Sequence, residues 1–271
     1  MRDRAYDRLP MDIPGIKHRY GSNVHILADP FHLGLLGRLT AKGTIQPEIN
    51  TLVVALYQHL TKVILNAELS RKNISIPTRM IDQTPRGMFH GEVIDSESRV
   101  ISVNIARAGT LPSQVAFDLL NGVLNPTLVR QDHMIMNRVV DDEDQVTGVS
   151  VMGSKIGGDV DDAIVLFPDP MGATGVSICK ALRIYKDEVP GTPRKMVAAN
   201  LIVTPEYLKR ITTEHPDVVV FAIRLDRGMS PPEIFSTTPG DRWDEERGLD
   251  DRQYIVPGGG GFGELMNNAF V

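Results

Sequence analysis

Cysteine is nearly absent from this chain, and long apolar runs are absent altogether. The one cysteine, Cys179, excludes an internal disulfide bond and any zinc site built from several cysteines. No apolar run approaches the length needed to span a membrane, and the charged start, MRDRAYDRLPMD, has no apolar core behind it. We therefore expect no signal peptide, no membrane partner and a reducing compartment, the cytoplasm.

Neither sign of charge is in strong excess. The 271 residues include 29 Lys and Arg against 34 Asp and Glu, a formal net charge of -5, which gives no electrostatic footprint for nucleic acid. His90, His133 and His215 lack the spacing of metal ligands, so no protein-bound metal site is predicted. The hydrophobic content of 42% is enough for a large core, and we expect one domain over residues 1–271.

The stretch over residues 163–177, AIVLFPDPMGATGVS, is the most informative part of the chain. Five apolar residues lead into turn formers and then into a glycine-punctuated segment, a pattern typical of a buried parallel strand that ends in a loop. The residues that follow, 176–186, have a helix-compatible composition. A strand, a glycine-rich loop and a helix start favour phosphate binding, because loop N–H groups and the positive helix end converge on one anion.

Strands and helices alternate through the second half of the chain. The expected strands cover residues 99–105, 134–136, 163–167, 196–203 and 218–223, and the expected helices cover residues 31–39, 48–67, 113–124, 176–186 and 205–214. Short β-like pieces over residues 75–94 indicate a hairpin or projecting arm, and residues 1–30 form a polar lead-in. This order predicts an α/β fold with a mainly parallel sheet flanked by helices and with ligands at the carboxyl ends of the strands.

Three of the expected strand ends carry groups that suit an anionic ligand. Arg107 and Arg138 would bring two guanidinium groups beside the glycine-rich loop, which indicates a ligand with more than one phosphate. Asp169 cannot bind phosphate, but its carboxylate suits sugar hydroxyls or, through water, a Mg²⁺ ion. Together these residues predict a site for a phosphorylated ribose.

Several motifs in a fixed order resemble one known family. DPMGATG at residues 169–175 resembles the phosphoribosyl-pyrophosphate (PRPP) loop of uracil phosphoribosyltransferases, and ARAG (106–109), RQDHMIMNR (130–138), TPEYLKRITTEHPDV (204–218) and YIVPGGGGFGE (254–264) follow that family's pattern. The resemblance covers residues 20–229 and 249–271. It implies a type I phosphoribosyltransferase fold with a C-terminal hood over residues 249–271, in a homodimer or a higher homo-oligomer.

The resemblance also implies roles for individual residues. Arg107 would contact PRPP, Arg138 would meet the pyrophosphate, and Asp169 would bind the ribose hydroxyls; we expect these three residues to be catalytic. Backbone groups in the hood would recognise uracil. The residues implied in the PRPP loop are Asp169, Pro170, Met171, Gly172, Ala173, Thr174, Gly175, Val176 and Ser177, and those implied for uracil are Tyr254, Ile255, Gly260, Gly261 and Phe262.

The reaction implied by the resemblance is the transfer of the phosphoribosyl group of PRPP to N1 of uracil, which gives UMP and pyrophosphate in pyrimidine salvage. Mg²⁺ would act as the cofactor and would be bound mainly through PRPP. Such an enzyme stabilises the departing pyrophosphate, orients the base and excludes water, so it needs no strong side-chain nucleophile.

The chain departs from the family pattern mainly in the hood. The family motif YIVPGxGDxGD has an aspartate where this chain has Gly261, and Glu264 stands at the second aspartate, from where it would need a changed loop path to replace the first. Val139 and Val140 follow Arg138 where acidic residues and threonine are usual. Residues 230–248 resemble an insertion that lengthens the lid, forms an oligomer contact or is an inert surface loop.

These departures leave two functions open. The first is an active, Mg²⁺-dependent uracil phosphoribosyltransferase. The second is a diverged family member, either a regulatory protein that binds a nucleotide or PRPP, or a transferase for another base. Gly261 favours the second reading, whereas Arg107, Asp169 and the glycine-rich loop favour an intact PRPP site.

Overall fold

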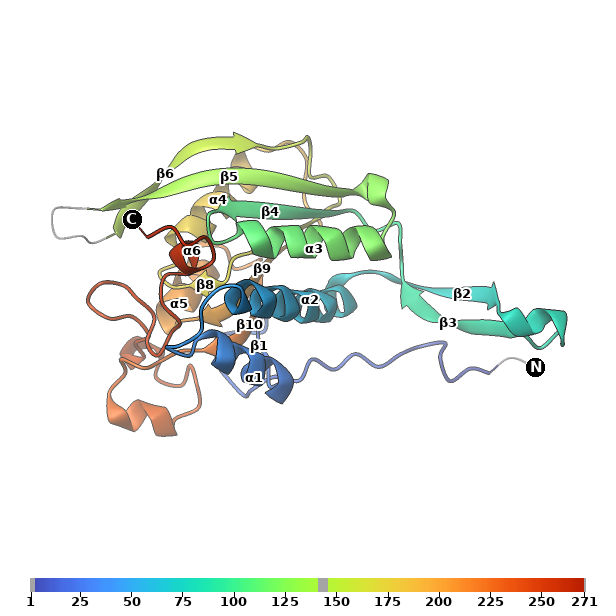
Figure 1. Cartoon of the computed structure of the whole chain (residues 1–271), viewed down its shortest axis with the longest axis horizontal. Helices are drawn as coiled ribbons and strands as arrows, with labels where there is room; N and C mark the ends of the chain where they lie inside the picture. The colour runs from blue at the N-terminus through green and yellow to red at the C-terminus, as the bar shows by residue number, and fades with distance from the viewer. Residues whose placement is uncertain (1–2, 141–145, 271) are drawn as a thin grey trace.

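One mainly parallel sheet forms the centre of the protein. The computed structural model describes residues 3–140 and 146–270. Its strands are β1 (Val24–Ile26), β2 (Arg71–Pro77), β3 (Met88–Ile94), β4 (Val100–Ala106), β5 (Val129–Val140), β6 (Val146–Lys155), β7 (Ile164–Pro168), β8 (Met171–Gly172), β9 (Lys195–Val203) and β10 (Val219–Leu225). The central sheet has the order β1-β10-β9-β7-β4-β5-β6, with β8 paired to β9, and only the β5–β6 pair in it is antiparallel (Figure 1).

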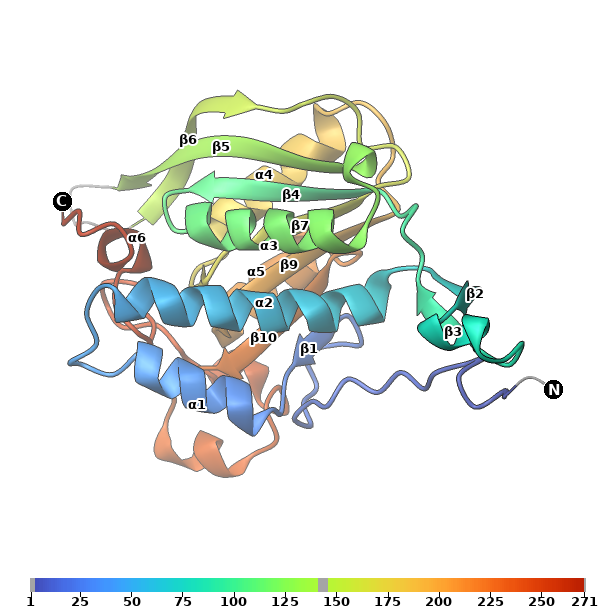
Figure 2. The ribbon, with the colours of Figure 1, turned by 45° about the vertical axis from the view of Figure 1, so that its right-hand side comes forward.

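Helices cover both faces of this sheet. They are α1 (Pro30–Leu39), α2 (Glu48–Glu68), α3 (Thr110–Val123), α4 (Val176–Asp187), α5 (Pro205–Glu214) and the short α6 (Phe262–Leu265). Figure 2 shows α1, α2 and α3 across the near face, with α4 and α5 behind the strands. Two separate clusters of buried side chains result, one on each face. Among the described residues, no helix is both long and apolar enough to cross a bilayer.

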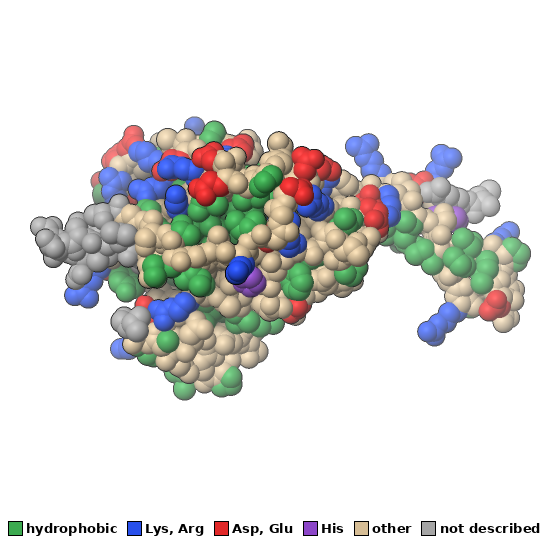
Figure 3. All heavy atoms as spheres, turned by 90° about the horizontal axis from the view of Figure 1, so that it is seen from above, with side chains coloured by type: hydrophobic (Ala, Val, Ile, Leu, Met, Phe, Trp, Pro, Cys, Tyr) green, Lys and Arg blue, Asp and Glu red, His purple; other side chains and the backbone are tan. Residues whose placement is uncertain are grey.

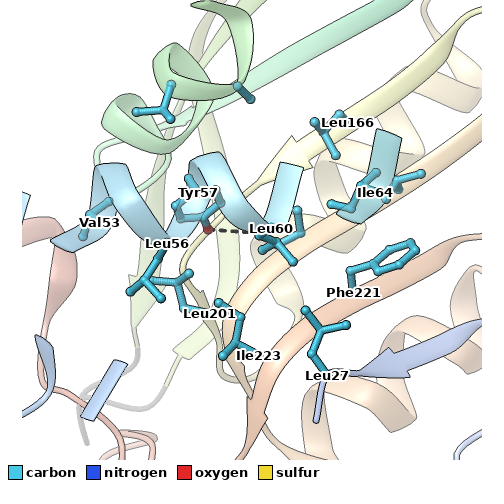
Figure 4. Packing of buried hydrophobic residues seen from close by; sticks show 14 of the residues in the cluster. Leu27, Val53, Leu56, Tyr57, Leu60, Ile64, Leu166, Leu201, Phe221 and Ile223 are labelled. Atoms are coloured by element: carbon cyan, nitrogen blue, oxygen red, sulfur yellow. Dashed lines mark hydrogen bonds between the residues drawn. The ribbon is translucent and has the colours of Figure 1, made fainter. Parts of the chain in front are cut away.

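Helix α2 forms because its apolar residues repeat at helical spacing. Leu52, Val53, Leu56, Leu60 and Ile64 are all buried, and they pack against strand residues such as Leu166, Leu201 and Phe221 (Figure 4). Folding removes this face of the helix from water, and the burial of each large apolar side chain stabilises the folded state by roughly 1.5–3 kcal/mol. The predicted helix over residues 48–67 is therefore confirmed.

A two-stranded hairpin stands apart from the central sheet. Strands β2 and β3 pair antiparallel, from Arg71 opposite Ile94 to Pro77 opposite Met88, and they extend away from the body (Figure 1). Figure 3 shows apolar and basic side chains gathered on this arm. The predicted arm is thus confirmed.

The fold class is confirmed, but two features of the strands differ from prediction. The strand expected at residues 134–136 does not end at Arg138, since β5 continues to Val140. It continues because β6, which the sequence did not indicate, supplies an antiparallel partner, with Arg138 opposite Val149. The lead-in also contributes an edge strand, β1, which pairs with β10.

Candidate functional site

Two loops meet at the carboxyl edge of the central sheet. The first follows β4 and contains Arg107, Ala108 and Gly109, and the second follows β7 from Asp169 onward. A Cβ atom at Gly109 would lie 2.8 Å from the Ile105 carbonyl oxygen and 3.1 Å from that of Pro168. A larger residue at position 109 would therefore push the two loops apart, so the glycine keeps them in contact.

Side chains from β9 and α5 fix the path of the glycine-rich loop. Asn200 donates a hydrogen bond to the Asp169 carbonyl oxygen at 2.7 Å, and the Tyr207 hydroxyl donates to the Asn200 side chain at 2.9 Å. The Thr204 hydroxyl donates to the Ala173 carbonyl oxygen at 2.6 Å. These groups are buried, so their hydrogen bonds hold the loop in one conformation before any ligand binds.

The loop ends at the start of α4 in a conformation that leaves backbone donors available. Gly175 is the N-cap residue, with a φ of 79°, and its cap has no side-chain hydrogen bond. A residue with a Cβ is strained at this φ, which explains the glycine. The first N–H groups of a helix lack internal partners and carry a partial positive charge. Thr174 and Ser177, both half-buried, add hydroxyl groups beside them. This geometry suits a phosphate group.

Asp169 lies at the mouth of the same loop and is half-buried. Its carboxylate accepts a long hydrogen bond from the Met171 N–H at 3.4 Å. Burial raises the pKa of the Tyr57 and Tyr207 hydroxyls well above the usual value, and the negative charge of Asp169 raises both further. Both tyrosine hydroxyls therefore stay protonated, and hence uncharged, near the Asp169 carboxylate.

The hood, residues 249–271, is held to β10 and α5 by charged side chains. Asp226, which is buried, accepts a hydrogen bond from the Gly258 N–H at 2.8 Å and pairs with Arg224 at 2.6 Å. Arg224 in turn donates to the Gly258 carbonyl oxygen at 2.9 Å. Glu206 of α5 accepts from the Gly248 N–H, just before the hood, at 2.9 Å and from the Leu249 N–H, at its start, at 3.4 Å. Sequence reasoning missed these three charged residues: Arg224 and Asp226 lie between the motifs that carry the resemblance, and Glu206 lies inside one of them without a pattern that marks it as a support of the hood.

Backbone groups of the hood remain available near Ile255. Leu249 and Ile255 lie opposite each other, and the two hydrogen bonds around them use the Val256 N–H and the Tyr254 carbonyl oxygen. The Ile255 backbone groups are not used in this pairing. The side chain of Ile255 is buried, whereas Tyr254 is 47% exposed. The hood thus offers main-chain groups of the kind expected for recognition of a base.

The hood also lies against the loop after β4. Arg107 donates a hydrogen bond to the Ala269 carbonyl oxygen at 3.3 Å, and a Cβ at Gly263 would lie 3.9 Å from the Arg107 Cβ. On its other side, residues of the hood and of the α1–α2 loop line a cavity of about 330 Å³, and Gln46 of that loop donates to the Leu265 and Met266 carbonyl oxygens at 3.1 Å. Gly260 and Phe262 both line this cavity. The loop after β4, the glycine-rich loop and the hood therefore form one continuous region.

Glu264 takes up the space beside Gly261. A Cβ at Gly261 would lie only 1.8 Å from Oε2 of Glu264, so the carboxylate folds back over the glycine. The Glu264 carboxylate therefore reaches the place beside Gly261. The single turn of α6, which begins at Phe262 just after its N-cap Gly261, brings residue 264 back over residue 261. The Glu264 carboxylate thus lies beside Gly261, the position at which the family motif has an aspartate.

The backbone of Arg138 lies on β5 beyond the end of β4. Ile135 pairs with the last residue of β4, Ala106, and Arg138 follows three residues later, about 10 Å further along the strand. Arg138 is therefore part of a projecting β5–β6 hairpin and not of a strand-end loop. Lys155, at the end of β6, is exposed. The acidic run DDED at residues 141–144 lies outside the described residues.

Residues 230–248 form an ordered structure packed against the body. Glu246 is buried, pairs with Arg227 at 2.9 Å and accepts a short hydrogen bond from the Tyr20 hydroxyl. The Trp243 indole donates to the Pro205 carbonyl oxygen at 2.9 Å and packs edge-on against Tyr20. This segment links the lead-in, α5 and the start of the hood, so it is not an inert surface loop.

A family model matches most of the chain. The model, described as uracil phosphoribosyltransferase, covers residues 34–245. The chain belongs to the uracil phosphoribosyltransferase family. A uracil phosphoribosyltransferase of Mycoplasmoides gallisepticum is 34% identical over 113 residues, 42% of this chain and 44% of that protein. Another, from Pyrobaculum islandicum, is 28% identical over 190 residues, 69% of this chain and 75% of that protein.

Comparison with solved structures supports the same fold. The AQ2163 protein from Aquifex aeolicus superimposes with a TM-score of 0.68 and 21% identity, over 92% of this chain and 99% of that one. At this identity the likeness concerns the fold alone. Together with the family match and the sheet order, it confirms the predicted type I phosphoribosyltransferase fold.

Proposed function

We propose that this protein of the uracil phosphoribosyltransferase family transfers the phosphoribosyl group of PRPP to N1 of uracil. The observation that carries the proposal is the contact between three loops, those after β4 and β7 and the hood, at the carboxyl edge of the sheet. The same edge is where open parallel sheets bind their ligands. A donor with a phosphate at each end and a ribose between fits these three neighbouring loops.

Each loop has a distinct role in the proposed reaction. The N–H groups over residues 174–177, with the hydroxyls of Thr174 and Ser177, bind the 5′-phosphate of PRPP, while the Ala173 N–H donates to the Met171 carbonyl oxygen within the loop. The Asp169 carboxylate accepts hydrogen bonds from the ribose hydroxyls, and the exposed Arg107 guanidinium binds the pyrophosphate. Arg138 approaches the same pyrophosphate from the β5–β6 hairpin.

The hood orients the base in this proposal. Main-chain groups of Ile255 and of residues 260–262 hydrogen-bond to uracil, and Tyr254 lies beside them. The N1–C1′ bond forms as the C1′–O bond to pyrophosphate breaks, and the N1 proton leaves to solvent. A wrong base leaves buried hood groups without partners, which is the physical basis for discrimination.

A Mg²⁺ ion fits the donor types present. Asp169 and Glu264 offer carboxylate oxygens, the hard ligands that Mg²⁺ prefers, while PRPP itself offers phosphate oxygens. When bound, the ion neutralises charge on the pyrophosphate. The carboxylate of Glu264 beside Gly261 supplies the acidic group that the hood motif otherwise lacks.

A diverged function is the second candidate, and Gly261 favours it. The hood motif is altered at that position, whereas the half of the site assigned to PRPP keeps Arg107, Asp169 and the glycine-rich loop. Such a combination fits a transferase for another base or a protein that binds PRPP or a nucleotide without turnover.

One assay separates these functions. Purified protein is incubated with PRPP, Mg²⁺ and each nucleobase in turn, and pyrophosphate release is followed. Release with uracil alone supports the proposed reaction, and release with a different base assigns another acceptor. Binding of PRPP without release on any base would overturn the enzymatic function.

A further inference from the structure

The glycine-rich loop has no positively charged residue of its own. Residues 169–177, DPMGATGVS, include neither lysine nor arginine. Its contacts to an anion are therefore neutral N–H and hydroxyl groups, together with the partial charge of the α4 start. A phosphate monoester carries between one and two negative charges near pH 7, so a nearby cation would strengthen its binding.

Helix α5 places one arginine directly on this loop. The Cδ and Cβ atoms of Arg210 lie 3.4 and 3.5 Å from the position of a Cβ at Gly175. Tyr207, one turn earlier on the same helix face, packs over Gly172, where its ring atoms lie 3.1 Å from the Cβ position. The aliphatic stem of Arg210 therefore lies over the N-cap of α4, and its guanidinium begins one bond further on.

Arg210 shares its nearest carboxylate with a second arginine. Its Nε lies 3.7 Å from Oε1 of Glu214, which is longer than a hydrogen bond. The same carboxylate has a second cationic partner, Arg183, at 3.2 Å. Two arginines therefore share one glutamate, so Glu214 does not fully pair with Arg210.

We infer that Arg210 is a further binding residue of this site and that its guanidinium contacts the 5′-phosphate of the ligand. This role rests on the proposed assignment of the glycine-rich loop to that phosphate. The side chain is 39% exposed, so it can turn toward the ligand about its terminal bonds. Arg210 completes the phosphate site with the full charge that the loop lacks, and it does so from a different helix.

The test compares two ligands that occupy different ends of the site. Calorimetry measures the binding of ribose 5-phosphate and of pyrophosphate to the unaltered protein and to Arg210→Ala, Arg210→Lys and Arg183→Ala. Arg183→Ala is the matched control, because it removes the same charge and the other partner of Glu214. Arg210→Ala should weaken ribose 5-phosphate about 10- to 100-fold and leave pyrophosphate within about twofold. Arg210→Lys should recover part of the loss.

Three results would overturn this role. One is an equal loss for both ligands in Arg210→Ala, which would indicate general damage to the site. The second is an equal effect of Arg183→Ala and Arg210→Ala on ribose 5-phosphate. The third is no binding of that ligand to the unaltered protein. The two proposals can fail separately. If no base supports pyrophosphate release but ribose 5-phosphate binds in an Arg210-dependent way, the proposed reaction is overturned and the role of Arg210 stands.

Discussion

A single carboxylate decides how the altered hood motif should be interpreted. A Cβ atom at Gly261 would lie 1.8 Å from Oε2 of Glu264. A side chain at residue 261 and the present side chain of Glu264 therefore compete for the same space. A glycine at 261 makes room for the longer side chain from one turn later. We therefore expect the Glu264 carboxylate to take the role of the aspartate that the family motif has at position 261.

We expect the pair to show strong coupling in activity. Glu264→Gln should lower kcat/KM for PRPP about tenfold or more, because a charged contact is lost. Gly261→Asp alone should not raise activity, since the new side chain would displace Glu264 and bring two carboxylates together. The double variant should recover activity relative to Glu264→Gln. Initial rates at varied PRPP check this, and unchanged kinetics in Glu264→Gln would contradict it.

Cys179 offers a pH-dependent test at the same scale. Burial raises the pKa of its thiol to about 12, so the thiolate fraction stays very small up to pH 9. Because Cys179 is the single cysteine, labelling by a thiol reagent reports this site alone. We expect slow labelling of the folded protein at pH 8 and complete labelling in urea. Rapid labelling of the folded protein would show that the thiol is accessible.

Sequence patterns could predict the residues of the site but not the directions of all side chains. The glycine-rich loop followed from a run of apolar residues and turn formers, and the structure has a strand, a loop and a helix there. The return of Glu264 over Gly261 depends on one helical turn and one side-chain conformation, which spacing alone does not fix. Arg210 was missed because it lies mid-helix, although its spacing from Tyr207 matches that of Gly175 from Gly172.

At the scale of elements, the segment over residues 230–248 supports the hood. It joins the lead-in through Tyr20 and α5 through Pro205, and the hood begins where it ends. Its central buried group, Glu246, has Arg227 and the Gly240 N–H as partners at 2.9 and 2.8 Å. The segment therefore behaves as part of the core and not as an appended loop.

Replacement of Glu246 should lower the stability of the folded protein. Glu246→Ala leaves the nearly buried Arg227 without its carboxylate and should lower the free energy of unfolding by about 3 kcal/mol. Glu245→Ala is the control: its carboxylate is 48% exposed and pairs with the exposed Arg242, so a change under about 1 kcal/mol is expected. Urea denaturation measures both, and equal effects would rule out a buried role for Glu246.

The elements with regular apolar patterns could be predicted, and the others could not. Helix α2 and strands β7 and β9 have buried faces that set a clear period. Strand β6 contains serine and glycine, and β1 has only three residues, so neither gives a strong pattern. For the same reason the end of β5 was misplaced, since its length depends on pairing with β6.

For the whole molecule, the projecting arm carries exposed apolar side chains. Ile76, Met80 and Phe89 are 47%, 56% and 41% exposed on this hairpin, an unusual density of apolar surface on a thin extension. The homo-oligomer expected from the sequence has a candidate contact surface here (Figure 3).

We expect the arm to be required for a dimer. The unaltered protein should have about twice the chain mass of 29.9 kDa in light scattering, and Phe89→Asp with Met80→Asp should shift it toward one chain. Phe235→Asp, which changes a phenylalanine that is 53% exposed in the segment 230–248, is the control and should leave the mass unchanged. A monomeric unaltered protein at micromolar concentration would contradict this expectation.

The arrangement of the whole site follows from the order of strands and helices. Parallel strands linked by helices bring their carboxyl ends to one edge, so loops far apart in sequence meet there. Contact between the loops after β4 and β7, and between Arg107 and the hood, is the outcome of that topology. The alternation of elements was enough to predict the edge, whereas the supports of the hood, such as Asp226 and Glu206, required the structure.

The central claim is that this edge binds PRPP. Calorimetric titration with PRPP and Mg²⁺ tests it directly in the unaltered protein and in Asp169→Asn, which keeps the size of the side chain and removes its charge. The account predicts saturable binding of one PRPP per chain and a loss of about 10- to 100-fold in affinity in the variant. Equal affinity in the two proteins, or no binding to the unaltered protein, would contradict it.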